Sequence, residues 1–402
     1  MSLNIVVIGT GAYVTGRGTD GFGTVMPAIC EWEKNNTLGN VYIAGTDPEG
    51  IKEGRKKISK LKRDMGVEAT IKYFPHNGKK NKESYKEAIR EIPKPACAIV
   101  VVPDNLHTEI ARYAIENGLH TLVVKPLAPT LKEVRELINV QKKNKVYCAV
   151  EFHKRLDLAN QKLKDVIREG SLGDLLRFVV EYSQRKSVPS KLFKNWVTST
   201  NIFQYLGIHY VDIIYFVTGA RPKRAMATGQ KGWLLSKGID AHDSIQAAIE
   251  WEVPSGKKFI SYILTNWVDP EKTTAMSYQK IDAVGTKGSF KSDQKNRGIT
   301  IVTDEKGVEN PNPYFCAPYG AKGSVAYRGY GIESFHQFLS DVAAIGEGIL
   351  KIKELEGKRP TFKESLVPTA VLEAVNKSLE SEGAWIPVSS VEADLPAVNV
   401  HM

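Results

Sequence analysis

Few cysteines occur in this 402-residue sequence, and none of them forms a metal-binding or redox motif. The sequence has neither a Cys-x-x-Cys pair nor a His/Cys cluster, and its four cysteines lie far apart, at Cys30, Cys97, Cys148 and Cys316. Structural zinc sites and disulfide-rich secreted domains both need closely spaced cysteines. We therefore expect no bound metal and a reducing, cytoplasmic environment.

Long apolar runs, a leader segment and nucleic-acid motifs are missing as well. No run approaches the roughly 20 apolar residues of a membrane helix, and the N-terminus enters a strand without the basic region of a signal peptide. The basic residues give a net charge of +10 but are spread along the chain without interleaved aromatics. We expect no membrane or nucleic-acid partner, and a positive field that favours anionic ligands.

The length and the pattern of apolar segments predict two domains and a tail, at residues 1–152, 153–388 and 389–402. In the first, short apolar strands alternate with amphipathic helices, which predicts a Rossmann-type, doubly wound parallel sheet. Beyond Gly219, alternating strands separated by polar turns predict an α/β domain with a large open, mainly antiparallel sheet. The last of these expected strands is Ile299–Thr303.

Glycines follow the first expected strand, Asn4–Ile8, as Gly9-Thr10-Gly11. Glycines at this point let the backbone approach the pyrophosphate of a dinucleotide. The motif is irregular, because an insertion separates Gly11 from Gly23, where the next helix is expected to begin. We interpret the insertion as a flexible flap whose Arg17 is available to a phosphate.

An acidic residue, Asp47, follows the second expected strand, Val41–Ala44. A carboxylate here accepts hydrogen bonds from the adenosine ribose and repels a 2′-phosphate, which favours NAD over NADP. NADP stays open, since basic residues follow at Arg55–Lys57. The alternative for Asp47 is a helix cap ahead of Pro48.

A lysine interrupts the apolar run Leu122–Pro129. Lysine is rarely buried without a partner or a function, and an apolar wall lowers its pKa. Pro126 keeps Lys125 extended, so its amine projects from the carboxyl end of a strand, where ligands bind in such sheets. The alternative is an edge-strand lysine that reaches solvent.

The segment Ile202–Phe216 is apolar on nearly every face and predicts a buried helix. Tyr205, His209 and Asp212 fall along one face of it. Histidine is a natural general base near neutral pH, and Asp212 is placed to orient its ring. The alternative for His209 is a core histidine with satisfied hydrogen bonds.

Four motifs, in this order, resemble the glucose–fructose oxidoreductase/inositol dehydrogenase/rhizopine catabolism (Gfo/Idh/MocA) family: Pro103–His107, Gly118–Pro126, Glu151–Arg155 and Gly207–Asp212. The resemblance implies an N-terminal Rossmann domain and a C-terminal domain whose sheet forms the interface of a homodimer or homotetramer. It also implies cofactor contacts from Pro103, Asn105 and His107, with Lys125 touching both the cofactor and the substrate hydroxyl. His209 matches the family's proton acceptor.

Three positions depart from the family pattern. Val124 replaces the usual glutamate before the lysine, so the charge partner of Lys125 must come from elsewhere. Tyr205 stands where many members have an aspartate, and His153 where many have an asparagine, two residues before Arg155. We expect His153, Arg155, Tyr205 and Asp212 to contact the substrate, with a packed linker residue as the alternative for His153.

These observations predict an NAD(H)-dependent oxidoreductase acting on a secondary alcohol or ketone of a sugar, polyol, sugar phosphate or nucleotide sugar. Two alternatives stay open. One is a non-catalytic, cofactor-sensing regulatory protein, because fold does not fix function. The other is a reductase of a non-sugar carbonyl.

Overall fold

The computed structural model of the protein describes residues 2–76 and 78–391. They form two compact units. Among these residues, the first unit contains residues 2–76, 78–128, 132–153 and 314–363, and the second contains residues 129–131, 154–313 and 364–391. The prediction assigned residues 314–363 to the second domain, whereas the structure groups them with the first unit. Most of the predicted tail, at 392–402, lies outside the described residues.

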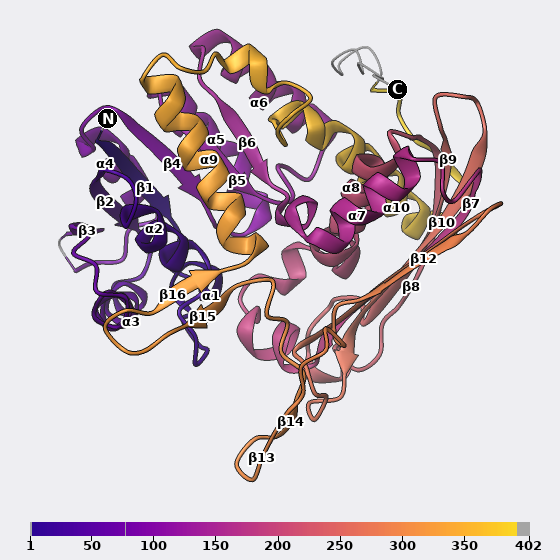
Figure 1. Cartoon of the computed structure of the whole chain (residues 1–402), viewed down its shortest axis with the longest axis horizontal. Coiled ribbons are helices and arrows are strands. Elements are labelled where there is room, and N and C mark those ends of the chain that lie inside the picture. Colours follow the sequence, from indigo (N-terminus) through magenta and orange to yellow (C-terminus); the bar gives the residue numbers. More distant parts are fainter. Residues whose placement is uncertain (1, 77, 392–402) are drawn as a thin grey trace. The chain divides into compact units, whose positions relative to one another are not determined.

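The first unit contains a six-stranded sheet of order β3-β2-β1-β4-β5-β6, with every neighbouring pair parallel (Figure 1). The strands are β1 (Leu3–Ile8), β2 (Leu38–Ala44), β3 (Ile71–Phe74), β4 (Ala96–Val100), β5 (His120–Val124) and β6 (Cys148–Glu151). The helices are α1 (Ala12–Thr15), α2 (Val25–Glu33), α3 (Pro48–Met65), α4 (Ser84–Glu91), α5 (His107–Glu116), α6 (Leu131–Asn144) and α9 (Tyr330–Gly346). This arrangement confirms the doubly wound parallel sheet.

Both faces of this sheet are covered, because every residue of β1 is buried. Leu3, Ile5 and Val7 belong to a core shared with α2, α3 and α9. Phe335 and Phe338 of α9 are part of that core, which explains why residues 314–363 return to this unit. Strand β3 and helix α4 were not predicted from the sequence, and for α4 the reason is that lysines between residues 79 and 86 obscured its apolar side.

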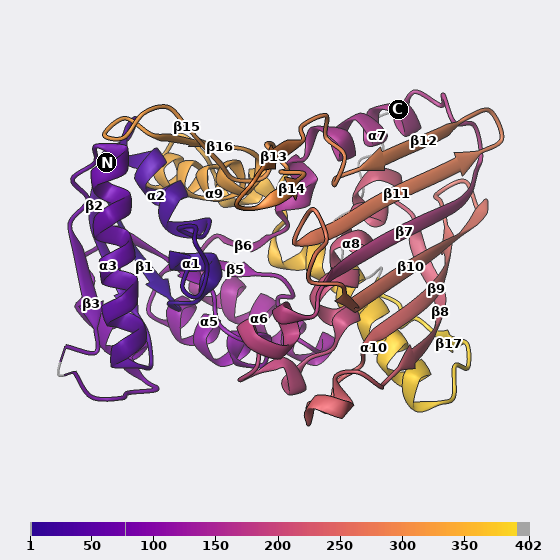
Figure 2. The ribbon, with the colours of Figure 1, turned by 90° about the horizontal axis from the view of Figure 1, so that it is seen from below.

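The second unit contains a seven-stranded sheet of order β12-β11-β7-β10-β9-β8-β17 (Figure 2). The strands are β7 (Leu175–Arg185), β8 (Arg221–Gln230), β9 (Ser244–Glu252), β10 (Lys258–Asp269), β11 (Ser277–Gly285), β12 (Ser289–Asp293) and β17 (Ile386–Pro387). Only the pair β7–β10 is parallel, so the mainly antiparallel prediction is confirmed. The prediction did not include β7, the strand that joins the two antiparallel parts.

Helices α7 (Leu158–Arg168), α8 (Ile208–Thr218) and α10 (Leu366–Glu380) pack together, and α10 contacts β8. The predicted strand Ile299–Thr303 does not join the large sheet. Instead, β13 (Ile301–Thr303) pairs with β14 (Gly307–Glu309) in a separate hairpin, and β15 (Ala317–Tyr319) pairs with β16 (Ala326–Arg328) in the first unit. Among the described residues, no helix has the length and apolar character needed to cross a membrane.

Candidate active site

The glycine turn after β1 fits the backbone of a dinucleotide-binding loop. Gly9 has φ +126°, and a Cβ there would lie 2.0 Å from the Val101 carbonyl oxygen, so only glycine is tolerated. No other atom lies within 4 Å of a Cβ built on Gly11, which leaves that backbone open to a ligand. Thr10 is half-buried between these glycines, and a Cβ built on Gly45 would lie 2.8 Å from Thr10 Cγ2.

The insertion between Gly11 and Gly23 makes hydrogen bonds to α3 in the structure, and its flexibility as a flap stays a prediction. It contains α1 and is held by α3, because the Lys57 amine donates to backbone carbonyls of Gly16, Thr19 and Gly21. Gly23 closes it with φ +75°, where a Cβ would lie 2.6 Å from the Ala12 carbonyl oxygen.

Asp47 caps α3, as one of the two interpretations predicted. Its carboxylate accepts hydrogen bonds from the Glu49 and Gly50 amides at 3.4 and 3.3 Å. The Arg17 guanidinium of the inserted segment lies 3.5 Å from the Asp47 carboxylate and 3.3 Å from Glu53. Capping does not exclude ribose binding, so this role of Asp47 stays a prediction.

The loop after β4 holds the motif Pro103–His107. Pro103 precedes a short 3-10 turn, Asp104–Leu106, in which Asn105 is exposed. The His107 ring is 1% exposed, with its nitrogens 2.6 Å from the Pro126 carbonyl oxygen and 2.9 Å from that of Val102. Burial lowers the pKa of His107. The ring therefore ties this loop to the residue after Lys125.

Lys125 directly follows β5 and is half-buried, with a cis peptide bond to Pro126. Burial lowers the pKa of Lys125 to about 8, while the carboxylates of Asp104 and Glu151 act in the opposite direction. An amine of this pKa is close to its titration point near neutral pH and can exchange a proton with a bound hydroxyl.

Glu151, at the end of β6, is the centre of a buried hydrogen-bonded cluster and is 2% exposed. One carboxylate oxygen accepts bonds from the Tyr13 and Ser334 hydroxyls at 3.1 and 2.8 Å. His153 Nδ1 lies 2.9 Å from both oxygens. The His153 ring stacks on Tyr330, with centroids 5.8 Å apart. Packing of His153 is thus established, and its contact with substrate stays a prediction.

In the second unit, His209 lies on α8 and is 4% exposed. A five-residue π-helical turn, Phe203–Gly207, precedes α8. Such turns often mark functional sites in helices. The ring of His209 lies beside Tyr182 of β7, with centroids 6.0 Å apart. The predicted buried helix is confirmed, with this turn replacing its first residues.

Tyr205 lies in the π-helical turn and is half-buried among aromatic rings. Its centroid lies 4.9 Å from Phe193, 5.7 Å from Trp196 and 5.8 Å from Trp267. An aromatic wall therefore surrounds the position where many relatives have an aspartate. Such a wall offers faces for stacking on a ring, whereas an aspartate would offer a charged hydrogen-bond acceptor.

Arg155 and Asp212 are paired with each other within the second unit. Arg155 Nε donates to Asp212 Oδ2 at 2.9 Å, and its Nη1 donates to Glu364 at 3.1 Å. Burial lowers the pKa of Arg155, but the carboxylates of Asp212 and Glu364 outweigh it and raise that pKa. Both oxygens of Asp212 accept bonds from Arg155. Asp212 thus has a structural partner in Arg155, and its orientation of His209 stays a prediction.

The structure thus brings Lys125 and the motif around His107 together in the first unit, and Tyr205, His209 and Asp212 in the second. Sequence reasoning missed Tyr13, Asp104, Glu151 and Ser334. Asp104 and Glu151 lie inside the motifs Pro103–His107 and Glu151–Arg155, so their negative charge could have indicated a role near Lys125. No sequence pattern indicated that Tyr13 and Ser334 bind Glu151.

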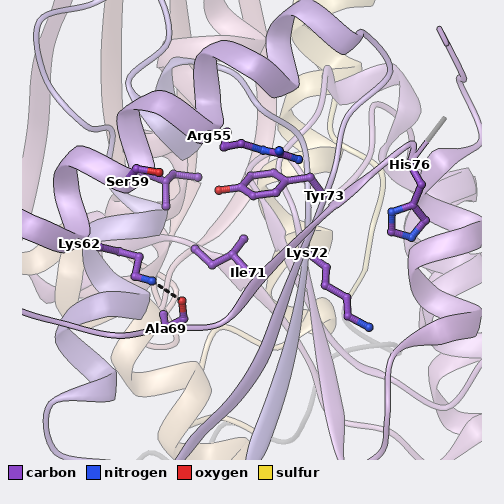
Figure 3. A pocket seen from close by; sticks show the side chains of 9 residues that line it. Arg55, Ser59, Lys62, Ala69, Ile71, Lys72, Tyr73 and His76 are labelled. Carbon is purple, nitrogen blue, oxygen red and sulfur yellow. Dashed lines mark hydrogen bonds between the residues drawn. The ribbon is translucent and has the colours of Figure 1, made fainter. Parts of the chain in front are cut away.

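A separate pocket of about 410 Å³ lies between α3 and β3, and its lining contains no residue of the predicted site (Figure 3). Arg55 lies over the ring of Tyr73 at 4.6 Å, and Lys62 donates to the Ala69 carbonyl at 2.7 Å. Arg55 was one of the basic residues that kept NADP open. The structure shows it in contact with Tyr73 (Figure 3).

Two models of one protein family match this chain. The model described as an oxidoreductase family with an NAD-binding Rossmann fold matches residues 51–152, and that of the GFO/IDH/MocA C-terminal domain matches residues 160–291. A myo-inositol 2-dehydrogenase of Thermotoga maritima is 25% identical over 253 residues, covering 62% of this chain and 69% of that protein. A levoglucosan dehydrogenase of Pseudarthrobacter phenanthrenivorans is 26% identical over 373 residues, covering 84% and 90%.

Solved structures share the fold. A scyllo-inositol dehydrogenase of Lactobacillus casei with bound NAD(H) and scyllo-inositol has a TM-score of 0.66 at 16% identity, covering 97% of this chain and 100% of that one. An inositol dehydrogenase homologue of Azotobacter vinelandii complexed with NADH and myo-inositol has a TM-score of 0.69 at 16% identity, covering 96% and 98%. The chain therefore belongs to the Gfo/Idh/MocA family of oxidoreductases, with an NAD-binding Rossmann domain in its first unit.

Proposed function

We propose that the protein is an NAD(H)-dependent dehydrogenase that interconverts a secondary alcohol and a ketone of a sugar, polyol, sugar phosphate or nucleotide sugar. The observation that carries the proposal is Lys125, a half-buried amine with a pKa of about 8 at the carboxyl end of β5. The names of the relatives, myo-inositol 2-dehydrogenase and levoglucosan dehydrogenase, support a substrate of this class.

In the proposed reaction, Lys125 and His209 act on the same substrate hydroxyl. His209 accepts the hydroxyl proton as the alcohol is oxidised, and the ammonium of Lys125 stabilises the negative charge that develops on the oxygen. A bound nicotinamide supplies the hydride acceptor. The half-buried aromatic wall around Tyr205 fits one face of a sugar or cyclitol ring.

The proposal includes a cytoplasmic homodimer or homotetramer formed through the sheet of the second unit. Its support is the face of that sheet on which Tyr262 of β10 is 40% exposed. All four cysteines are free thiols, which agrees with a reducing compartment.

The first experiment is a titration with NADH and NADPH, followed by energy transfer from the tryptophans, together with turnover on a panel of polyols, sugars, sugar phosphates and nucleotide sugars. Lys125→Met and His209→Ala should each lower turnover by about 10²- to 10⁴-fold, because each removes a group that moves or stabilises charge in the transition state. Both variants should still bind NADH.

Exposed residues of the same types supply the matched controls, Lys132→Met and His76→Ala. Near-normal turnover in both site variants would contradict the assignment of these residues. A non-catalytic cofactor sensor remains the second candidate, because Val124 and Tyr205 replace acidic residues of the family. NADH binding without turnover of any panel compound would favour that candidate, and turnover of non-sugar ketones only would point to a different carbonyl.

A further inference from the structure

Val124, which stands where the family has a glutamate, lies beside an acidic residue of the neighbouring strand. In the family pattern, a glutamate precedes the lysine, and here Val124 stands in its place. Strands β5 and β6 are parallel neighbours, and their register pairs Val124 with Glu151. Glu151 is thus directly beside Val124 at the carboxyl edge of the sheet, one strand away.

The surroundings of Glu151 suit a fixed negative charge. A buried carboxylate is tolerated when hydrogen bonds satisfy it, and Glu151 accepts them from Tyr13, Ser334 and His153. Burial and the Glu151 carboxylate raise the pKa of Tyr13. The Tyr13 hydroxyl therefore stays protonated and donates a hydrogen bond to Glu151. These bonds hold the carboxylate in one place.

We propose that Glu151 supplies from β6 the negative charge that the family places in β5, and that it is a positioning residue and charge partner for Lys125. The proposal rests on the function assigned above to Lys125. Asp104 supplies the other carboxylate near the amine. The loss of the family's glutamate at 124 is therefore compensated by a register-paired glutamate on the neighbouring strand.

The titratable groups around this pair determine the sign of the effect. Asp104, His107 and Glu151 act on Lys125, and Tyr13 and His153 contact Glu151. Burial lowers the pKa of Lys125 to about 8, and the two carboxylates oppose that shift. Removing the Glu151 charge therefore lowers this pKa further, so that Lys125 loses its proton at a lower pH.

The test uses the full chain without substrate. Reductive methylation with labelled formaldehyde, read by mass spectrometry, reports the pH at which the Lys125 amine becomes reactive. Glu151→Gln keeps an oxygen that accepts from Tyr13 and Ser334 but removes the charge, and it should move the midpoint down by roughly one unit. Adding Val124→Glu to this variant should return the midpoint to that of the unaltered protein.

Glu116→Gln, the same change at an exposed position of α5, should leave the midpoint unchanged. An unchanged midpoint in Glu151→Gln would overturn the proposal. If Glu151→Gln does not fold, the double variant is compared with the unaltered protein, and a lowered midpoint in it counts against the proposal. This readout does not depend on turnover. The role of Lys125 in catalysis is therefore tested separately, by the turnover of Lys125→Met.

Discussion

At the scale of single residues, the Arg17 guanidinium bears on the preference between NAD and NADP. The sequence predicts that Asp47 binds the adenosine ribose. Binding of NADP stays a second possibility, because basic residues follow at 55–57. In the structure, Arg55 covers Tyr73 and Lys57 binds the inserted segment, so both have structural contacts. Arg17 instead lies beside Asp47. A guanidinium here offsets the carboxylate that would repel a 2′-phosphate.

Replacing Arg17 should therefore change the preference between the two cofactors. Arg17→Ala removes the positive partner of Asp47, and we expect the Kd for NADPH to rise by about threefold to tenfold, because this partly exposed pair is screened by solvent. The Kd for NADH should change less. Fluorescence titration of both cofactors measures the ratio.

Lys56→Ala is the matched control, because Lys56 is an exposed cation of α3, the helix that Asp47 caps. It should leave the ratio of the two Kd values unchanged. If Arg17→Ala weakened both cofactors equally, Arg17 would act on the shared pyrophosphate and not on the 2′ position.

At the scale of elements, side chains of α3 and its N-cap hold the inserted segment between Gly11 and Gly23. The Lys57 amine bonds three of its backbone carbonyls, and the Gly18 amide donates to Glu53 at 3.3 Å. Because the Lys57 amine makes three of the bonds that hold this segment, local opening of the segment should be sensitive to Lys57.

Lys57→Met keeps the apolar part of the side chain and removes the donor. We expect faster amide hydrogen exchange at residues 16–21, while β1 and α2 keep their protection, since the change affects local opening and not global unfolding. Exchange read by mass spectrometry measures this, with Lys56→Met as the control. Unchanged exchange in the inserted segment would show that its own turns hold it in place.

Elements with a strong period were predictable from the sequence. Strand β1, helix α8 and the alternating strands β9 and β10 follow from apolar pattern alone, as does a lysine in the apolar run that ends with β5. The partner of Lys125 did not follow, because the pairing of Val124 with Glu151 depends on the register of two strands. The membership of residues 314–363 in the first unit was not predictable either, because no local sequence pattern shows which core α9 packs into.

The same limit applies to the charged residues of the second unit. A sequence shows that Arg155 and Asp212 are in suitable motifs, but it does not show that each neutralises the other. That pairing has an energetic consequence, since removing one partner of a buried ion pair costs about 3–5 kcal/mol. Loss of activity in an Arg155 or Asp212 variant would therefore need a stability measurement before it is attributed to substrate binding.

At the scale of the whole molecule, the net charge of +10 bears on the choice among substrates. A positive field raises the local concentration and association rate of anions, and it does nothing for a neutral polyol. Salt screens this attraction over a Debye length of about 10 Å at 0.1 M ionic strength. Salt dependence therefore distinguishes a phosphorylated or nucleotide-linked sugar from a neutral one.

If the natural substrate is anionic, its kcat/KM should fall by about threefold to tenfold as ionic strength rises from about 0.02 M to 0.5 M at saturating NAD. The neutral sugar of the same stereochemistry is the matched control, because it shares the reacting hydroxyl and lacks the charge. Its kcat/KM should stay nearly constant over the same range. An equal fall for both compounds would mean that salt acts on the protein or on cofactor binding, and the field of the molecule would then carry no information about the substrate.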